Sequence, residues 1–224
     1  MTDYSFIENT MLFKDSSEEE IRDMLLCLGA EQKCFEKNEV IYFAGDLVQD
    51  FGLVLTGSVY IESDDFWGNH TILNHIGAGF VFAETYACVP ATPLMVTVRA
   101  AEKCNILFLN ATRILKTCPN TCSHHSRLIQ NLLMITAQKN LQLSRKISHT
   151  SPKSIRGRVL SYLSFQATLH DSYDFDIPFN RQQLADYLSV DRSALSNELS
   201  KMQNDGLFVF HKNHFHLIAK LPDS

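Results

Sequence analysis

The spacing of hydrophobic positions changes twice along the chain, and the first pattern is helical. Residues 16–28 (SSEEEIRDMLLCL) place apolar side chains on one face of a helix, and Ser16 or Ser17 precedes three glutamates. A serine N-cap accepts a hydrogen bond from a free backbone N–H, and acidic residues in the first turn interact favourably with the helix dipole. The segment is therefore predicted to form a short amphipathic helix.

Between about residues 33 and 110 the pattern becomes that of a β-protein. Short runs of branched and aromatic residues alternate with turn-forming segments at 44–46, 67–69 and 77–79. The runs are VIYF (40–43), GLVLTGSVYIES (52–63), HTILNHI (70–76), LMVTVRA (94–100) and CNILFLN (104–110). Many short strands at this spacing are typical of a barrel or a double-sheet jelly roll.

A helical pattern returns at about 123–148 and contains a heptad seam. Its members recur at spacings of 4, 3, 4, 3 and 4 residues and are Ile129, Leu133, Thr136, Asn140, Leu143 and Ile147. Such a seam indicates a helix that pairs with its copy in a homodimer, where a polar residue such as Asn140 can fix the register. The apolar face is widened by Leu128, Leu132 and Ile135. Packing of the helix on its own sheet, alone or in addition to dimerisation, is the alternative.

Ser151-Pro152 ends this helix, because proline lacks a backbone donor and disfavours helical geometry in the residue before it. A second helix is predicted at about 153–169, and it is followed by the polar loop His170–Asp176. A hinge or boundary is therefore expected near 149–153.

Residues 179–218 have the pattern of two helices followed by a β-hairpin. Asn180 is placed to cap a helix over about 181–188, and Asp191 to cap a second helix over about 192–204. Asp205-Gly206 ends the second helix, since glycine readily adopts the left-handed C-terminal conformation. Two β-like runs then flank a turn at Lys212-Asn213. The pattern predicts a helix-turn-helix followed by a wing.

The second of these helices has an apolar side and a polar side. Leu195, Leu199 and Met202 are predicted to face inward, and the small Ala185 allows a close helix crossing. The outward residues are Arg192, Ser193, Ser196, Asn197 and Lys201. A helix fits the major groove of DNA, where Arg pairs with guanine, Asn with adenine, and Ser with bases or phosphate. An ordinary helical hairpin with a solvated face is the alternative.

Charge adds little to this picture. The net charge is −5, but residues 151–224 contain equal numbers of cationic and anionic side chains. One cationic group precedes the helix pair and consists of Arg145, Lys146, Lys153, Arg156 and Arg158. Grouped cations can neutralise DNA phosphates, and a solvated helix face has the same pattern.

Composition and targeting signals are those of a cytoplasmic protein. The chain is 45% hydrophobic and 20% charged, and no apolar run approaches the roughly 20 residues of a membrane helix. The N-terminus lacks the pattern of a secretory signal, so no membrane association is expected. The six cysteines are then predicted to be free thiols rather than a disulfide framework.

Nearly the whole chain resembles the Crp/Fnr superfamily of transcription regulators, with the segments in the same order. The β-rich region is similar to the cyclic-nucleotide-binding roll of that family at 45–46, 52–59, 77–80, 82–84 and 98–100. The most specific match is 181–202 (RQQLADYLSVDRSALSNELSKM), which resembles the family's helix-turn-helix.

The resemblance implies an α+β fold and a set of partners. It implies a sensor β-roll (a double-stranded β-helix, or jelly roll) at 1–122, a dimerisation helix and hinge at 123–150, and a winged helix-turn-helix DNA-binding domain at 151–224. A homodimer would bind a two-fold symmetric site on double-stranded DNA and contact RNA polymerase, for which the loop His170–Asp176 is a candidate.

The resemblance also indicates which residues contact DNA. They are expected to be Arg181, Gln182, Arg192, Ser193, Ser196, Asn197 and Lys201. Many family members have an arginine at the position of Asn197, placed to contact guanine. Asparagine favours adenine or a weaker contact, so the common half-site of the family does not carry over.

The family's nucleotide-binding pattern is only half present. Glu84 matches the glutamate that holds the ribose hydroxyl, but the Arg-Ser pair expected about ten residues later falls on Leu94 and Met95. Neither can neutralise a phosphate, and Arg99 matches a structural residue of the next strand. We therefore expect weak or absent cAMP binding and an unidentified effector. The candidate effector pocket comprises Phe82, Ala83, Glu84, Leu94, Met95, Asn140, Leu143 and Ser144.

Cysteine and histidine residues raise other sensing chemistries. Cys118 and Cys122 lie close to His124 and His125, but the spacing is not that of a standard zinc site, and the chain lacks the N-terminal cysteine cluster of the oxygen-sensing branch. No metal site is assigned. Thiol oxidation at Cys118 or Cys122 and haem binding at His75 remain alternatives to ordinary thiols and structural histidines.

The sequence fits two other functional classes less well. A small-molecule, metal or redox sensor with a degenerate DNA-binding domain would have lost basic residues from its recognition helix. Asn197 is a step in that direction, but Arg192 and Lys201 remain. The sequence has no nucleophile–base pairing, phosphate loop or HExxH motif, so an enzyme is not expected.

Overall fold

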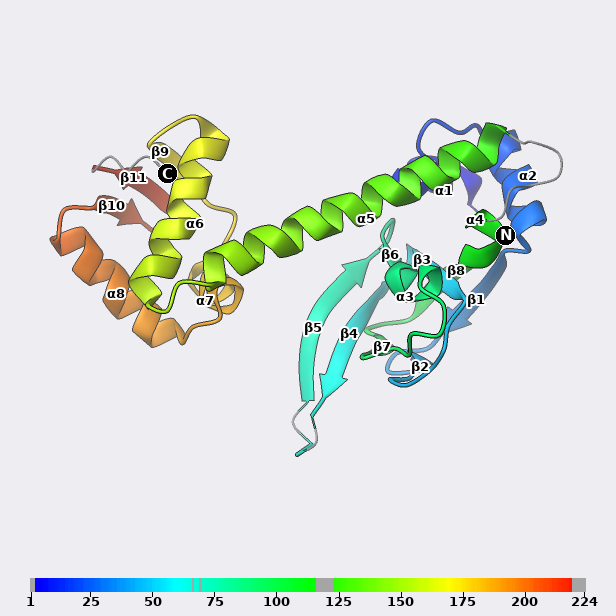
Figure 1. Cartoon of the computed structure of the whole chain (residues 1–224), viewed down its shortest axis with the longest axis horizontal. Coiled ribbons are helices and arrows are strands. Elements are labelled where there is room, and N and C mark those ends of the chain that lie inside the picture. Colours follow the sequence, from blue (N-terminus) through cyan, green and yellow to red (C-terminus); the bar gives the residue numbers. More distant parts are fainter. Residues whose placement is uncertain (1–2, 66, 69, 116–122, 219–224) are drawn as a thin grey trace. The chain divides into compact units, whose positions relative to one another are not determined.

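The chain forms two compact units that have one helix in common. The structure, a computed structural model, describes residues 3–65, 67–68, 70–115 and 123–218, without the side chains of 123 and 124. The units are Met1–Gln138 and Lys139–Ser224, and the long helix α5 (Ser123–Thr150) contributes residues to both (Figure 1). The division into parts at 122 and 150 stays a prediction.

Two four-stranded antiparallel sheets form the centre of the first unit. One has the order β1 (Glu31–Phe35), β8 (Cys104–Asn110), β3 (Asp50–Thr56) and β6 (Val81–Phe82). The other has the order β2 (Val40–Tyr42), β7 (Thr97–Ala100), β4 (Ser58–Asp64) and β5 (His70–Gly77). This confirms the predicted jelly roll. The apolar run at 52–63 forms two strands, because Gly57 turns the chain with φ of 74°.

The sheet containing β3 and β8 is covered on both faces. Ile106 and Phe108 belong to the core between the sheets, whereas Leu107 and Leu109 belong to a second core under the helices. Successive side chains of a strand point to opposite faces, so a strand buried on both sides is apolar throughout. This arrangement explains the continuous run ILFL at 106–109.

Short helices complete the first unit. Helix α2 (Glu18–Leu28) is the predicted one, and Ser17 rather than Ser16 caps it, in a capping box with Glu20. The sequence did not predict α1 (Tyr4–Glu8), the 3-10 helix η1 (Met11–Phe13), α3 (Glu84–Cys88), α4 (Ala111–Leu115), or the strands β1 and β6. Each of these elements has five residues or fewer, which is too short for a hydrophobic period to be recognised in the sequence.

Helix α5 uses different faces for different purposes. Leu128 and Leu132 are buried in the core under the helices, and Ile135 packs against it. Of the predicted seam, Ile129 also packs against this core and Thr136 is half-buried, whereas three members are more than 60% exposed: Leu133, Leu143 and Ile147. The helix thus packs on its own unit and still presents an apolar stripe to solvent.

The second unit is a three-helix domain with a small sheet. Its helices are α6 (Ile155–His170), α7 (Arg181–Leu188) and α8 (Arg192–Asn204), and the sheet has the order β10 (Phe208–His211), β11 (His214–Leu217) and β9 (Asp174–Asp176). Helix α5 ends at Thr150, before Ser151-Pro152, as predicted.

The prediction of a continuous loop at 170–176 is wrong in its second half. Residues 174–176 pair with β11 as strand β9, and Phe175 enters the core while its two aspartate neighbours stay exposed. One buried residue in a polar segment is too little to reveal a strand by its pattern. None of the helices in the described ranges has the length and apolarity that a membrane-spanning segment requires.

Candidate functional site

The two helices of the predicted helix-turn-helix begin where their caps require. Asn180 and Gln183 form a capping box at the start of α7, and the Asp191 carboxylate accepts a hydrogen bond from the Ala194 N–H (2.8 Å) at the start of α8. Ser189 turns the chain between the helices with φ of 55°. The helices observed at 181–188 and 192–204 confirm the predicted bounds. Both helix starts could be predicted because each depends on hydrogen bonds between neighbouring residues.

Helix α8 has one buried and one exposed side. Leu195, Leu199 and Met202 are fully buried in the core of the second unit. The polar side is formed by the exposed residues Arg192, Ser193, Asn197 and Lys201, together with the half-buried Ser196. All five residues that the sequence predicted to face outward therefore lie on the solvent-facing side of α8.

The serines of this side have local partners. The Ser193 hydroxyl donates to the Asp191 carboxylate (2.5 Å), and the Ser196 hydroxyl donates to the Arg192 carbonyl (3.0 Å). The hydrogen bonds from Ser193 and from the Ala194 backbone lower the pKa of Asp191. The cap therefore stays ionised under all ordinary conditions, and it fixes the first turn of the helix.

Arg181 packs on an aromatic ring of the second unit and lies near the turn of the wing. Its guanidinium lies 4.9 Å from the centre of the Phe210 ring, and it donates to the Lys212 carbonyl (3.5 Å). Gln182 at the next position donates to Asp186 (2.8 Å). A concavity between the start of α7 and the wing turn has Arg181, Arg192 and Lys212 in its wall. The wall of this concavity is therefore cationic, which favours the approach of a nucleic acid.

The cationic group before the helix pair is largely engaged within the domain. Arg158 donates to the carbonyls of Pro152 (2.9 Å), Leu188 (3.0 Å) and Ser189 (2.9 Å). Arg156 pairs with carboxylates of α8 and its C-cap, and the Arg145 guanidinium lies 5.2 Å from the centre of the Phe165 ring. The interpretation of this group as a free phosphate-binding cluster is therefore not supported for these three arginines.

A buried aromatic cluster surrounds the last turn of α5. The ring of His149 is 3% exposed and lies against Tyr162, Phe165 and Tyr187, with Nδ1 2.9 Å from the Tyr187 hydroxyl. Desolvation, and secondarily the charge of Arg145, lower the pKa of His149. The histidine is therefore held in its neutral form in the folded protein.

This histidine predicts a loss of stability in mild acid. A group whose pKa is lower in the folded than in the unfolded state favours unfolding once the pH falls below its unfolded value, about 6.5. The thermal midpoint of the wild type should therefore fall from pH 8 to pH 5 more steeply than that of His149→Gln, which cannot take up the proton. Parallel pH profiles of the two proteins would contradict this role of His149.

Five of the predicted effector residues belong to the roll, and the structure gives each a different environment. Phe82 and Leu94 are buried, Ala83 is the N-cap of α3 with φ of 61°, and Glu84 is 3% exposed. Leu94 is hydrogen-bonded through its backbone to Gly45 (2.7 Å) and Asp46 (2.9 Å). Met95 is 78% exposed, so its side chain points to solvent rather than into the roll.

Aromatic rings occupy the interior of the roll near these residues. The ring centres of Tyr42, Phe82 and Phe108 lie 5.9 to 6.5 Å from one another. Arg99 donates to the buried carboxylate of Glu62 (2.9 Å) and to the Asn38 carbonyl (2.9 Å). This matches the structural position that the resemblance implied for Arg99.

The remaining effector candidates belong to α5. Asn140, Leu143 and Ser144 are exposed, and the Ser144 hydroxyl donates to the Asn140 side chain (3.3 Å). Their participation in a pocket of the roll stays a prediction.

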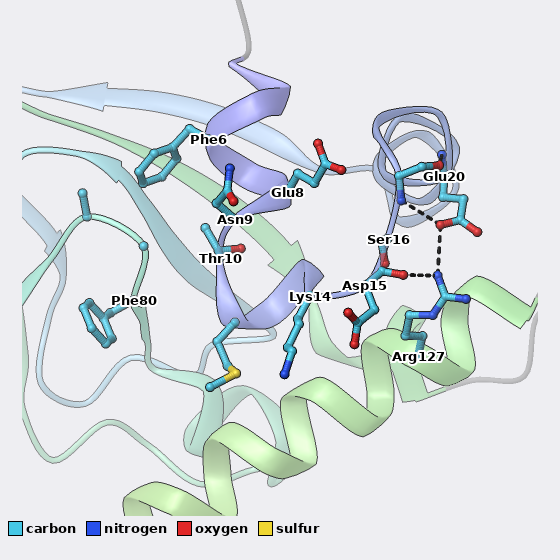
Figure 2. A pocket seen from close by; sticks show the side chains of 14 residues that line it. Phe6, Glu8, Asn9, Thr10, Lys14, Asp15, Ser16, Glu20, Phe80 and Arg127 are labelled. Atoms are coloured by element: carbon cyan, nitrogen blue, oxygen red, sulfur yellow. Dashed lines mark hydrogen bonds and ion pairs between the residues drawn. The ribbon is translucent and has the colours of Figure 1, made fainter.

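A groove that the sequence did not indicate lies beside the N-terminal helices (Figure 2). Phe6 and Phe80 lie on one side of it, and Arg127 of α5 lies on another. Arg127 is hydrogen-bonded to the Asp15 carbonyl (2.5 Å) and paired with Glu20 (3.0 Å). The groove is lined by residues 6, 8–11, 14–17, 20, 78–80 and 127, so it is separate from the predicted effector residues.

The cysteine and histidine candidates are only partly covered by the structure. Cys118, Cys122 and the side chain of His124 lie outside the described residues. His125 is buried, and neither ring nitrogen has a hydrogen-bond partner in the described part of the chain. The ring centres of His75 and Tyr60 are 5.0 Å apart, a contact that fits a structural histidine.

Comparisons with known proteins identify both parts of the chain. Residues 32–120 match the cyclic nucleotide-binding domain, and residues 157–220 match the Crp-like helix-turn-helix domain. The sequence has no match among curated proteins.

Solved structures show the same fold at low sequence identity. The catabolite activator protein of Thermus thermophilus is 18% identical, with a TM-score of 0.51 and 93% of each chain covered. The c-di-GMP-responsive regulator CLP of Xanthomonas campestris is 18% identical, with a TM-score of 0.54 over 91% of this chain and 100% of its own. CprK in complex with OCPA is 14% identical, with a TM-score of 0.58 and 88% of each chain covered.

Proposed function

Because the chain belongs to the Crp/Fnr family of DNA-binding transcription regulators, we propose that it reads a specific DNA sequence through the exposed side of α8. The family is not enzymatic, and its members join a cyclic nucleotide-binding domain to a Crp-like helix-turn-helix, as this chain does. We further propose that the protein acts in the cytoplasm and contacts RNA polymerase through residues 170–176.

The observation that carries the proposal is the two-sided character of α8. Three fully buried apolar residues fix the helix to its domain, and Arg192, Ser193 and Asn197 remain exposed at its N-terminal half. Side chains near the N-terminus of a recognition helix are those that reach base edges in the major groove. Arg181, Gln182 and Lys201 would add phosphate contacts around them.

The exposed stripe on α5 supports a homodimer. Leu133, Leu143 and Ile147 expose more than 60% of their surface and recur at heptad positions, and exposed large apolar residues repeated in this way are typical of an interaction site. A second copy of α5 would cover the stripe, with Asn140 of each chain in the seam. A two-fold symmetric dimer binds a site with two-fold symmetry, so we propose a palindromic target.

The proposed effector is not a cyclic nucleotide. Leu94 stands where the phosphate would need a cation, and Arg99 is already paired with the buried Glu62. An effector held by the roll would therefore be one that does not need a cation for its phosphate.

Addition of cAMP should leave the thermal unfolding midpoint unchanged. A ligand that binds only the folded state at 100 times its dissociation constant stabilises it by about 2.7 kcal/mol, which is readily detected. The measurement is differential scanning fluorimetry at millimolar cAMP, with a cAMP-binding member of the family run in parallel as a positive control. A clear shift for this protein would show that the interpretation of Leu94 is wrong.

Selection from a pool of random DNA duplexes tests the proposed function directly. The full-length protein should enrich one palindromic sequence, and the enriched duplex should compete with a shuffled duplex of the same composition. The protein for this selection should be purified from its own cells, so that any effector is retained. If this protein enriches no sequence, the result would instead indicate a sensor with a degenerate DNA-binding domain.

A further inference from the structure

One arginine connects the first helix of the DNA-binding unit to two separate points of α8. Arg156, in the first turn of α6, donates from Nε to the Glu198 carboxylate (2.8 Å). Its Nη2 pairs with the carboxylate of Asp205, the C-cap of the same helix. Two nitrogens of one guanidinium therefore donate to side chains of α8 and its cap.

The two anchor points are well separated along the helix. Positions 198 and 205 are seven residues apart, which corresponds to about two turns, or about 10 Å of helix axis. A single anchor would leave the helix free to pivot about it, whereas two anchors on one rigid planar group restrict both sliding and rotation. Guanidinium groups suit this task because their donors have a fixed, planar geometry.

We propose that Arg156 is a positioning residue that holds α8 in register with α6, so that the exposed residues of α8 meet base edges in the correct places. The proposal rests on the proposed function as a sequence-specific DNA-binding protein. The sequence left open whether Arg156 meets phosphate or solvent, and its partners in the structure are instead carboxylates of α8 and its C-cap.

The exposure of the three side chains indicates where the effect of Arg156 should be found. The exposed fractions are 40% for Arg156, 21% for Glu198 and 50% for Asp205. Ion pairs this accessible to water contribute little to folding stability, because solvent screens them. Recognition is more sensitive, because a binding group must be held within about 0.5 Å of its productive position. The loss should therefore appear in sequence discrimination before it appears in thermal stability.

Glu198→Gln separates positioning from direct DNA contact. This substitution removes a negative charge from α8, so electrostatics alone would leave DNA binding unchanged or tighter. Arg156→Gln removes a positive charge, and electrostatics alone would weaken binding. If the contact between them positions the helix, both variants should lose discrimination, although they change the charge in opposite directions.

The experiment measures binding to the duplex enriched by the wild type and to its shuffled counterpart, at several salt concentrations. We expect Arg156→Gln and Glu198→Gln each to lower the ratio of the two affinities by about three- to tenfold, and the double variant to lower it no further. Lys153→Gln, which removes an exposed positive charge from the same region, is the matched control and should keep the ratio. Arg156→Lys, with one donor group in place of the planar fork, should restore it only partly.

A second readout needs no DNA. Amide hydrogen exchange of the full-length protein should be faster in α8 of Arg156→Gln and Glu198→Gln than in the wild type, and unchanged in Lys153→Gln. Full discrimination by Glu198→Gln, or a salt dependence that falls only in Arg156→Gln, would overturn the proposal and assign Arg156 to a phosphate contact. If the wild-type protein does not discriminate between DNA sequences, the proposed function is refuted instead. In that case, unchanged hydrogen exchange in α8 of Arg156→Gln and Glu198→Gln would refute the positioning role as well.

Discussion

The Arg192→Ala variant is expected to bind its specific DNA site about 1–3 kcal/mol more weakly than the wild type, the usual loss for an arginine that reads a base. Arg192 is the first residue of α8 and is exposed, and its side chain forms no ion pair within the described parts of the chain. Its guanidinium is therefore available for a bidentate contact with guanine in the major groove. The measurement is a titration of the enriched duplex by fluorescence anisotropy.

The base-reading role requires that the loss depend on sequence. Affinity of Arg192→Ala for the shuffled duplex should fall far less than its affinity for the enriched duplex, because only the phosphate component is shared. The enriched sequence of the variant should also become more tolerant at one position of each half-site. Equal losses on both duplexes would assign Arg192 to a phosphate, and unchanged footprints would remove it from the interface.

The second large effect is expected at the exposed stripe of α5, where Leu143→Glu should convert the dimer to monomers. In a two-fold dimer the two copies of this residue face each other, so the substitution places two carboxylates in an apolar seam. A buried, unpaired charge costs about 3 kcal/mol or more, which weakens association by at least about a hundredfold. Sedimentation equilibrium at micromolar concentration measures the change.

Leu141→Glu supplies the matched control for this experiment. Leu141 lies on the same helix and is 55% exposed, but it is not a member of the seam. Its substitution should leave the dimer intact. Leu143→Glu should also bind the palindromic duplex poorly, since one monomer engages only one half-site. A dimer that survives Leu143→Glu and dissociates with Leu141→Glu would place the interface on the other side of the helix.

The helix-turn-helix could be predicted from sequence because its boundaries are set by neighbouring residues. Asn180 caps a helix whose capping partner is Gln183, and Asp191 accepts from Ala194, three residues away in each case. The inward and outward sides of α8 follow from the helical period alone. No knowledge of distant segments was needed for this part.

The cationic group before the helix pair, by contrast, has partners that are distant in sequence. Arg156 meets Glu198 and Asp205, which are 42 and 49 residues away, and Arg158 meets carbonyls 30 and 31 residues away. A run of cations has the same appearance in sequence whether it faces solvent or carboxylates of another helix. Only the fold brings these partners together.

The same limit applies to α5 and to the N-terminal groove. The heptad seam and the residues beside it are equally apolar in sequence. Leu132 and Leu133 are the same residue type, but in the structure Leu132 is 4% exposed and Leu133 is 67% exposed. The groove depends on α1 and on the turn at 78–80, and neither has a periodic pattern. Its walls come from three segments that are distant in sequence.

Strand β5 has a consequence for the handling of the protein. It lies at one edge of its sheet and β2 lies at the other, and β5 also exposes Ile72 and Leu73. An edge strand presents unpaired backbone groups that can accept a strand from another molecule. Pairing of β5 with β2 of a next molecule would be head-to-tail and would repeat without closing, unlike the symmetric dimer. In concentrated samples such pairing would produce open-ended filaments. The register shift between Ile61 and Glu62 on the neighbouring strand opposes this pairing, because an irregularity of this kind increases the twist of the edge.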